Sequence, residues 1–452
     1  MDLISAIGAD NDTQKADASV VEYTGQVISS TLSGDVSLRI LSESLLIVTA
    51  LDTTEIAFVD ITSIESVDYQ VVVATQGKTF RFARLGHWCQ PFYDELLIAY
   101  NRQVLRALFT QGDPLVKAAG DYRYEEEGVG AAGKAPLAVF ENCICVLPPD
   151  IGARRIPLSF VTDTDKGDFT LSLTIEDDWY QFAKLGYETQ PIEEAIETSM
   201  KTLREQNLST IRSIDSSLTG AVASQLARMM PAGSAIPLGR LREIAPSFLR
   251  AAEETISLSR AAHYYEELKT LSDPDSIALG FIKDDSFSSW REVGDTAGGE
   301  GAYEGVDALI AAHGDASALE DEVVEAMDVR TSESSTQALP YLFYLVVPSM
   351  DRRMCAVEFA VYEGDSAATF VYRCEEGFDA FVTRLNRAME AVDHARDVIS
   401  MDEDKLALVQ NRRYAMAVQR SSALRKVRAA FVGRVIHTTP ESWKKNLLSF
   451  FK

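Results

Sequence analysis

Cysteine and histidine are scarce in this chain. Its 452 residues include five cysteines and five histidines, and no two cysteines form a C-x-x-C pair. The odd number of scattered thiols predicts reduced, mostly buried cysteines. Cys143 and Cys145 lie on the same face of an expected strand, but two thiols without further ligands do not make a zinc site. We therefore expect no metal and no cofactor.

Long hydrophobic runs are missing as well. The longest apolar run, residues 341–348, is far shorter than the roughly 20 residues that cross a bilayer. The first residues lack the basic start and the apolar stretch of a signal peptide. The sequence thus predicts a cytoplasmic protein.

Positive charge is in short supply over most of the chain. Lysine and arginine number 43 against 68 acidic residues, which gives a formal net charge of −25. Nucleic acids and anionic lipids are bound by positive surfaces, so the bulk of this chain does not suit them. Residues 401–452 are the exception, with eleven basic and four acidic residues, which leaves −32 on residues 1–400.

Local signatures of catalysis are absent from the sequence too. It contains no G-x-S-x-G elbow and no H-E-x-x-H helix, and its many carboxylates occur in runs typical of a solvated surface. No catalytic residue is predicted. An enzyme whose site is assembled from distant residues stays an alternative, because such a site leaves no local motif.

Two glycine motifs have the letters of nucleotide-binding loops without their context. Residues 128–133 fit G-x-G-x-x-G, but an acidic run precedes them and strand-like sequence follows, which predicts a flexible hairpin loop. Gly77-Lys78-Thr79 resembles the end of a P-loop, but Val72 stands where the required glycine would be, so a β-turn is expected.

An internal repeat at a spacing of 100 residues organises the first half of the chain. Six positions of residues 80–95 are identical in residues 180–195, without a gap. The repeated residues include Phe82, Leu85, Gly86 and Pro91 in the first segment and Phe182, Leu185, Gly186 and Pro191 in the second. Self-similarity of this kind indicates one structural unit that occurs twice.

Each repeat predicts short antiparallel strands closed by one helix. In the first unit, β-type runs lie at 21–29, 36–40, 45–51, 55–58, 64–74 and 79–83. From Pro91 the apolar residues follow the spacing of an amphipathic helix that reaches Leu108. In the second unit, runs at 138–140, 143–147, 155–158, 169–175 and 179–183 precede a helix from 191 to about 211.

The whole chain divides into six predicted parts. They are a flexible arm at 1–20, the first unit at 21–115, the second at 116–212, a helical connector at 213–264, a third and diverged copy at 265–400, and a basic helical tail at 401–452. The third copy has strand-like runs at 276–282, 341–347, 354–362 and 368–373 and a helix from 378 to about 399. Residues 284–337 are expected to be a largely disordered acidic insertion.

This order of elements resembles the pleckstrin-homology-like superfold. The likeness rests on the strand order and on the junction Phe80-x-Phe82-Ala83-Arg84-Leu85-Gly86 with its echo, over residues 21–212 and again 265–400. It implies an α+β fold of tandem antiparallel barrels or sandwiches, each closed by a C-terminal helix, that bind peptides, proteins or lipid headgroups. Residues 26–38 contain no lysine or arginine, so no phosphoinositide binding is expected through the first hairpin.

The tail is the strongest candidate for a partner-binding surface. Its basic and aromatic candidates are Arg412, Arg413, Arg420, Arg425, Lys426, Arg428, Arg434, Trp443, Lys444 and Lys445. A helix of this composition suits another protein, an anionic membrane, a nucleic acid or the acidic body of its own chain. The sequence leaves these alternatives open.

Together these features predict a cytosolic, non-enzymatic scaffold that mediates protein–protein interaction through tandem pleckstrin-homology-like domains. Contact with partners is expected at exposed strand edges or between a sheet edge and its closing helix. One alternative is a peripheral membrane adaptor anchored by the tail. Another is an acidic chaperone of basic proteins, since tandem domains of this type with acidic stretches occur in histone chaperones. The partner and the oligomeric state do not follow from the sequence.

Overall fold

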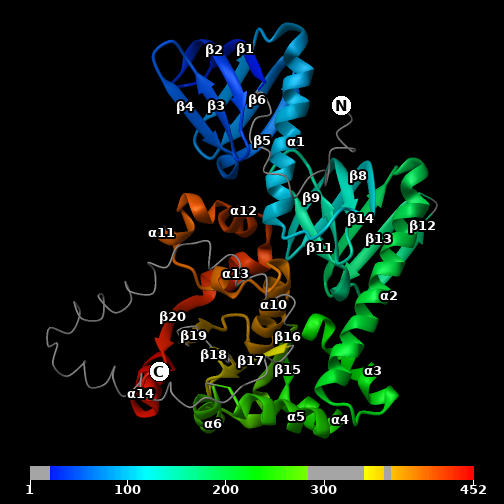
Figure 1. Ribbon diagram of the computed structural model, residues 1–452, viewed down its shortest axis with the longest axis vertical. Coiled ribbons are helices and arrows are strands. Elements are labelled where there is room, and N and C mark those ends of the chain that lie inside the picture. Colours follow the sequence, from blue (N-terminus) through cyan, green and yellow to red (C-terminus); the bar gives the residue numbers. More distant parts are fainter. Residues whose placement is uncertain (1–20, 168, 260, 284–340, 361–367, 452) are drawn as a thin grey trace, which may run out of the picture.

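The computed structural model describes residues 21–167, 169–259, 261–283, 341–360 and 368–451. Within them the chain is an α+β protein with antiparallel sheets of seven, seven and six strands (Figure 1). The expected arm at 1–20 and the expected insertion at 284–337 lie outside the described residues.

The first unit is a seven-stranded sheet followed by a helix. Its strands are β1 (Glu22–Ile28), β2 (Ser33–Ile40), β3 (Ser44–Val48), β4 (Thr53–Ala57), β5 (Ile61–Val67), β6 (Gln70–Thr75) and β7 (Thr79–Ala83). They pair in the order β4-β3-β2-β1-β7-β6-β5, and α1 (Cys89–Ala107) follows. The buried face of α1 carries apolar residues at helical spacing, as predicted.

The second unit repeats this architecture strand for strand. Its strands are β8 (Val116–Glu126), β9 (Val129–Val139), β10 (Cys143–Val146), β11 (Arg154–Pro157), β12 (Asp163–Gly167), β13 (Thr170–Ile175) and β14 (Asp178–Ala183). They pair in the order β11-β10-β9-β8-β14-β13-β12 and precede α2 (Thr189–Ile214). The identical strand order shows that the two units share one topology.

The repeated residues build the same strand-to-helix junction twice. Arg84 and Lys184 both adopt positive φ, 57° and 58°, and Gly86 and Gly186 follow at 59° and 64°. These left-handed turns redirect the chain from the last strand into a short 3-10 turn and then the helix. The remaining repeated residues are structural: Phe82, Leu85, Phe182 and Leu185 are buried in the two cores, and Pro91 and Pro191 lie in the first turns of α1 and α2.

A close approach of backbones recurs beneath each junction. A Cβ atom on Gly25 would lie 2.8 Å from the carbonyl oxygen of Ala83, and one on Gly120 would lie 2.5 Å from that of Ala183. Both positions are covered by the junction leucine, Leu85 in the first unit and Leu185 in the second. Only glycine leaves room for this packing.

The glycine-rich segment 128–133 is a turn and a strand, not a flexible loop. Glu127 and Gly128 both have positive φ and form the two-residue turn between β8 and β9, as in a type I′ hairpin. Residues 129–133 continue into β9 and pair along their length with β8. The hairpin that the sequence predicts is confirmed, but the expectation of a flexible loop was wrong, because the long partner strand β8, which is rich in charge, was not foreseen.

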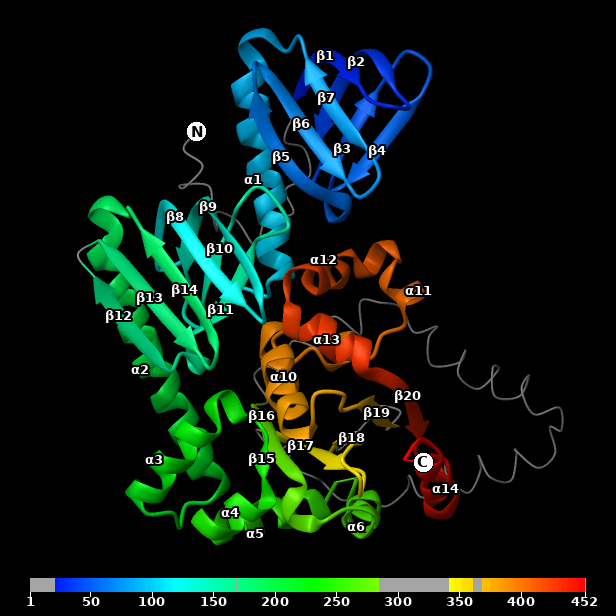
Figure 2. The same ribbon diagram turned by 180° about the vertical axis from the view of Figure 1, so that it is seen from behind.

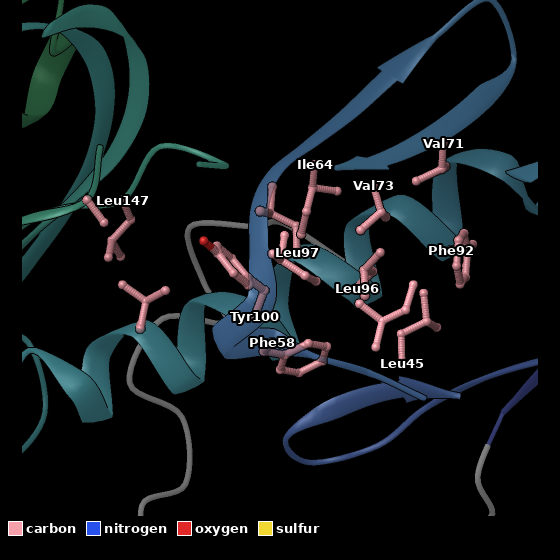
Figure 3. Close-up of a cluster of buried hydrophobic side chains, with 14 of the residues drawn as sticks. Leu45, Phe58, Ile64, Val71, Val73, Phe92, Leu96, Leu97, Tyr100 and Leu147 are labelled. Carbon is pink, nitrogen blue, oxygen red and sulfur yellow. The ribbon is translucent and has the colours of Figure 1, made fainter. Parts of the chain in front are cut away.

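The first two units share a core. In β10 the side chains of Ile144 and Val146 face the second unit's own interior, whereas Cys143 and Cys145 pack into the first unit's cluster. Figure 3 shows Leu147, just after β10, beside Tyr100 of α1 in that cluster. All five cysteines are buried and free, as the scattered thiols predict. Strand β10 is thus buried on both sides, which explains its unbroken apolar sequence.

The third sheet is a meander of six strands. It consists of β15 (Ile236–Pro237), β16 (Ala278–Lys283), β17 (Tyr341–Pro348), β18 (Met354–Phe359), β19 (Ala368–Arg373) and β20 (Phe431–Ile436), paired in that order. Alternate residues of β17 enter two different cores, with Phe343 and Leu345 on one side and Tyr344 and Val346 on the other. Helices cover both faces of this sheet (Figures 1 and 2). Strand β17, the longest apolar run of the sequence, is therefore buried on both sides.

The connector, the tail and the expected helix at 378–399 supply those covering helices. The connector helices are α3 (Gly220–Met229), α4 (Leu238–Ile244), α5 (Pro246–Ser257) and α6 (Ala262–Leu271). The expected helix at 378–399 is α10 (Phe378–Ala391) followed by a 3-10 turn at Arg396–Ile399. The tail contains α11 (Glu403–Leu406), α12 (Arg412–Arg420), α13 (Ser422–Ala430) and α14 (Pro440–Phe450).

Two expectations for these segments were wrong in detail. Residues 431–436 form β20 at the edge of the third sheet, where the sequence pattern predicts a continuous helix. The connector also contributes a strand, β15, to the opposite edge. The third sheet therefore extends beyond residues 265–400 on both sides. In the part of the chain that the structure describes, no helix is both long and apolar enough to cross a membrane.

Candidate functional site

The basic tail packs on the body of its own chain. Arg420, at the end of α12, is 1% exposed, and its Nη2 donates a hydrogen bond to the Tyr100 hydroxyl of α1 at 2.7 Å. Its Nη1 donates to the carbonyl of Met416 at 3.1 Å. Arg420, which the sequence predicts as a partner-binding residue, is thus part of the protein interior.

Other tail arginines hold the tail's own turns together. Arg425 donates to the carbonyl of Val418 at 3.3 Å and to the Ser422 hydroxyl at 3.0 Å. Arg428 donates to the carbonyl of Met401 at 2.8 Å and forms an ion pair with Glu403 at 2.5 Å. These contacts stabilise the path of the chain between α10 and α13.

Further cations of the tail contact the other units. Arg413 donates to the carbonyl of Arg106 at 2.7 Å and lies 4.0 Å from the ring centroid of Phe109. Other ion pairs join Arg412 to Glu55 of β4, Lys426 to Glu127 of the β8–β9 turn, and Lys444 to Glu267 of α6. The structure places the tail on the acidic surface of its own chain, one of the four alternatives that the sequence allows.

The end of the tail is anchored by Trp443. This side chain is fully buried, and its Nε1 donates to the Thr369 hydroxyl of β19 at 2.8 Å. The Thr369 hydroxyl also donates to Glu358 at 2.5 Å, and His437 Nε2 lies 3.1 Å from the same carboxylate oxygen. Of the predicted tail residues, Arg413, Arg434 and Lys445 are exposed.

A second class of predicted site, the sheet edge, is partly occupied in the first unit. The loop between β10 and β11 lies along β5, where Ser63 pairs with Asp150 in an antiparallel bridge. The Ile64 amide donates to the carbonyl of Pro149 at 2.8 Å, and the Ile151 amide donates to the carbonyl of Thr62 at 3.2 Å. Residues 149–151 therefore extend the first sheet by a short strand-like segment.

The corresponding edge of the second unit is open among the described residues. β12 corresponds to β5 at the spacing of 100 residues and ends its sheet in the same way, with no strand on its outer side in the part of the chain described. Thr164 pairs with Leu173 just as Ile64 pairs with Val73. The Thr164 amide thus corresponds to the Ile64 amide, which points outward to residue 149.

The open edge is acidic and lies beside α2 (Figures 1 and 2). Asp163 and Asp165 are exposed on β12. Lys166 connects the strand to the helix, with its Nζ 2.6 Å from Glu197 and 3.6 Å from Glu193. An extended polypeptide can add hydrogen bonds at such an edge, and basic side chains would complement its charge.

Sequence reasoning missed a cluster of buried ionisable groups where the units meet. Glu126 of β8 forms an ion pair with Arg154 at 2.7 Å and lies 4.0 Å from Arg387 of α10. Arg387 is also paired with Asp178 of β14. Arg155 of β11 lies 2.6 Å from Glu390 of α10. Buried pairs of this kind fix two surfaces in one arrangement, because breaking one leaves an uncompensated charge.

Burial shifts the titration of the acidic members of this cluster. Burial raises the pKa of Glu126, although Arg154 and Arg387 favour its charged form. Burial likewise raises the pKa of Glu390 against the effect of Arg155. The pKa of the neighbouring Tyr180 hydroxyl is raised well above its usual value, first by burial and then by Glu126. The expectation that carboxylates lie only in exposed runs was wrong for Glu126, Asp178 and Glu390.

Among the described residues, the geometry supports neither a metal site nor a nucleotide-binding loop at Gly77. Within the described ranges, no group of three histidine, cysteine or acidic residues is arranged to hold a metal ion. Gly77 lies in the turn between β6 and β7, as the sequence predicts.

No protein-family model matches this chain, and a search of curated proteins finds no match.

Proposed function

We propose that this chain is a non-enzymatic scaffold that binds an extended segment of a partner protein at the β12 edge of its second unit. Its first two units are, in this proposal, pleckstrin-homology-like domains. Seven antiparallel strands in the same order, followed by one helix, support that assignment for both units. The six-stranded meander of the third sheet gives a third such domain less support.

The observation that carries the proposal is the difference between two equivalent edges. In the first unit, β5 holds residues 149–151 through two backbone hydrogen bonds and the Ser63–Asp150 bridge. In the second unit, the same edge, β12, keeps its outer side unpaired within the described residues. Residues 149–151 on β5 thus show the kind of ligand that we propose for β12, a short extended segment.

The charge around β12 favours a basic segment. Asp163 and Asp165 are exposed on the strand, and Glu197 on α2 is exposed beside it. Lysine or arginine at alternate positions of the partner would lie close to these carboxylates. Main-chain hydrogen bonds would supply affinity, and this charge pattern would select the partner.

The test uses the full chain and a displayed library of random seven-residue peptides. Peptides selected on the wild type are then measured against Thr164→Pro and Thr164→Val. Proline removes the outward amide at the edge, a substitution that edge strands tolerate, whereas valine keeps the amide and the β-branched shape. We expect selected peptides to be basic, to lose at least tenfold in affinity for Thr164→Pro, and to bind Thr164→Val as they bind the wild type.

Selected peptides that bind Thr164→Pro as tightly as the wild type would overturn the proposal, as would failure to select any peptide. Circular dichroism of each variant, compared with the wild type, establishes that the second unit remains folded. An increase in affinity at low salt would support the role of the acidic residues.

A chaperone of basic proteins is the second candidate, because the same acidic edge favours basic clients in general. Capture of a basic protein that depends on residues 284–337 and is unaffected by Thr164→Pro would favour this function over edge recognition. The membrane-adaptor alternative requires the tail to face a lipid surface. The burial of Trp443 and Arg420 gives it little support.

A further inference from the structure

A small cavity lies where the first unit, the second unit, α10 and the tail meet. Its volume is about 30 Å³. Ala107 and Leu108 at the end of α1 form one wall, and the other walls come from β8, β11, β14, α10 and the α12–α13 corner. The first unit, the second unit, α10 and the tail therefore all contribute to this one space, which is partly open to solvent.

The cavity wall carries an excess of positive charge. Arg155, Arg387 and Arg420 line it, against one carboxylate, that of Glu126. Their buried partners add one more arginine, Arg154, and two more carboxylates, Asp178 and Glu390. Among the buried groups, four arginines thus meet three carboxylates. Two partly exposed carboxylates, Glu176 at 3.9 Å from Arg387 and Asp393 near Arg155, act more weakly because solvent screens them.

Arg420 is the cation that this count leaves uncompensated. The guanidinium donates to the Tyr100 hydroxyl, to the carbonyl of Met416 and to Gln419, which are all neutral acceptors. Its hydrogen-bond partners among the described residues include no carboxylate. A buried charge without a counter-charge is costly, so a bound anion at this point would stabilise the fold.

Two buried arginine N–H groups at this cavity also have no hydrogen-bond acceptor among the described residues. The Nε atoms of Arg420 and Arg155 are buried and have no hydrogen-bond partner in the described part of the chain. Both side chains line the cavity. A guanidinium offers its Nε–H and one Nη–H as a planar fork that fits the oxygen atoms of carboxylate and phosphate groups.

We propose that this cavity binds one small inorganic oxyanion with the chemistry of phosphate, held by Arg420 and Arg155. The volume is about 30 Å³, and a cavity needs at least roughly 10–15 Å³ to hold even one water molecule, so only a compact ion fits and a nucleotide or a lipid headgroup is too large. A bound anion would connect the tail to the second unit and strengthen the junction of all three sheets. This inference does not depend on the β12 edge.

The test is isothermal titration of the full chain with sodium phosphate, against sodium chloride at matched ionic strength. We expect one saturable site for phosphate and a phosphate-dependent rise in the unfolding temperature. Arg420→Gln should weaken phosphate binding at least tenfold. Arg434→Gln removes the same charge from an exposed tail position and should bind phosphate as the wild type does.

A second variant keeps all the arginines and fills the space. Ala391 lines the cavity from the end of α10, and Ala391→Leu should abolish phosphate binding while the chain stays folded. Adenosine monophosphate should bind more weakly than phosphate, because its nucleoside exceeds the volume of the cavity. The proposal is overturned if wild-type protein shows no saturable phosphate binding, if both variants bind phosphate normally, or if adenosine monophosphate binds as tightly as phosphate.

Discussion

Ser63 of β5 pairs with Asp150, a residue of the second unit, so that the second unit completes the sheet edge of the first. The bridge joins residues 87 positions apart and sits between two backbone hydrogen bonds. The two copies differ at this edge, since β12, the equivalent strand of the second unit, is paired on one side only within the described residues. Under the function proposed above, this docking would let one copy of the module serve as framework and the other as binding surface.

The Asp150 side chain is expected to hold that docked segment in shape. Its Oδ1 accepts a hydrogen bond from the Gly152 amide at 2.6 Å. Asp150→Ala removes the acceptor and should destabilise the docked conformation of residues 149–151 by about 1 kcal/mol. The Ile64 amide, which this segment protects, should then exchange about fivefold faster. Asp150→Asn keeps an acceptor oxygen and serves as the control. Equal Ile64 exchange in both variants would contradict this role.

Equivalent glycines in the two units should respond alike to substitution. Gly25→Ala and Gly120→Ala each force a Cβ against a carbonyl oxygen and should reduce the free energy of unfolding by about 1–3 kcal/mol. Gly77→Ala is the matched control, because no atom lies within 4 Å of a Cβ at that turn. Urea denaturation measures all three. A strong effect at only one of Gly25 and Gly120 would argue against equivalent packing.

The tail should behave as part of the fold and not as an appendage. Trp443→Ala removes a fully buried side chain and its hydrogen bond to Thr369, for an expected loss of about 3–5 kcal/mol. Leu448→Ala, at an exposed position of the same helix, should change stability by less than about 0.5 kcal/mol. Truncation after residue 400 should unfold the third sheet, because it removes β20. Wild-type stability of Trp443→Ala would contradict this prediction.

Stability should fall in mild acid partly because of His394. Burial lowers the pKa of this imidazole to about 4, with Asp393 opposing and Arg155 adding to the shift. An unfolded histidine binds a proton near pH 6.5, so between pH 6.5 and 4 the unfolded chain binds more protons and the fold loses stability as pH falls. The raised pKa values of Glu126 and Glu390 act in the opposite direction.

The measurement that isolates the histidine compares wild type with His394→Gln in urea at pH 7.5 and pH 5. The residue keeps some solvent exposure, so the wild type should lose about 1 kcal/mol more than the variant between these two values. The same pH dependence in both proteins would show that His394 does not contribute.

The duplicated architecture could be predicted because its local signals are strong. The strand-to-helix junction needs specific backbone geometry at Gly86 and Gly186, and it therefore keeps a recognisable sequence. Strand β12 was missed because Asp163, Asp165 and Lys166 remove any apolar alternation from an exposed edge. β20 was missed because Val427, Phe431 and Val435 also fit the spacing of a helix, and only pairing with β19 decides between the two.

The buried ionisable cluster could not be predicted from any local pattern. Arg154 and Glu126 are 28 residues apart, and Arg387 and Asp178 are 209 apart, so their pairing follows from the assembly of units. The only local sign of this cluster in the sequence is the pair Arg154 and Arg155, two charged residues beside the apolar residues of β11. The tail's composition indicated an anionic contact, but composition alone does not distinguish the chain's own acidic surface from a separate partner.

Backbone amide exchange at Thr164, with and without a selected basic peptide, tests the central claim most directly. The free chain should exchange this amide rapidly, since it lies on an exposed edge, while the Ile64 amide of the first unit stays protected by residue 149. Bound peptide should slow exchange at Thr164 and leave Ile64 unchanged. Peptide binding that leaves Thr164 exchanging as fast as before would contradict recognition at the β12 edge.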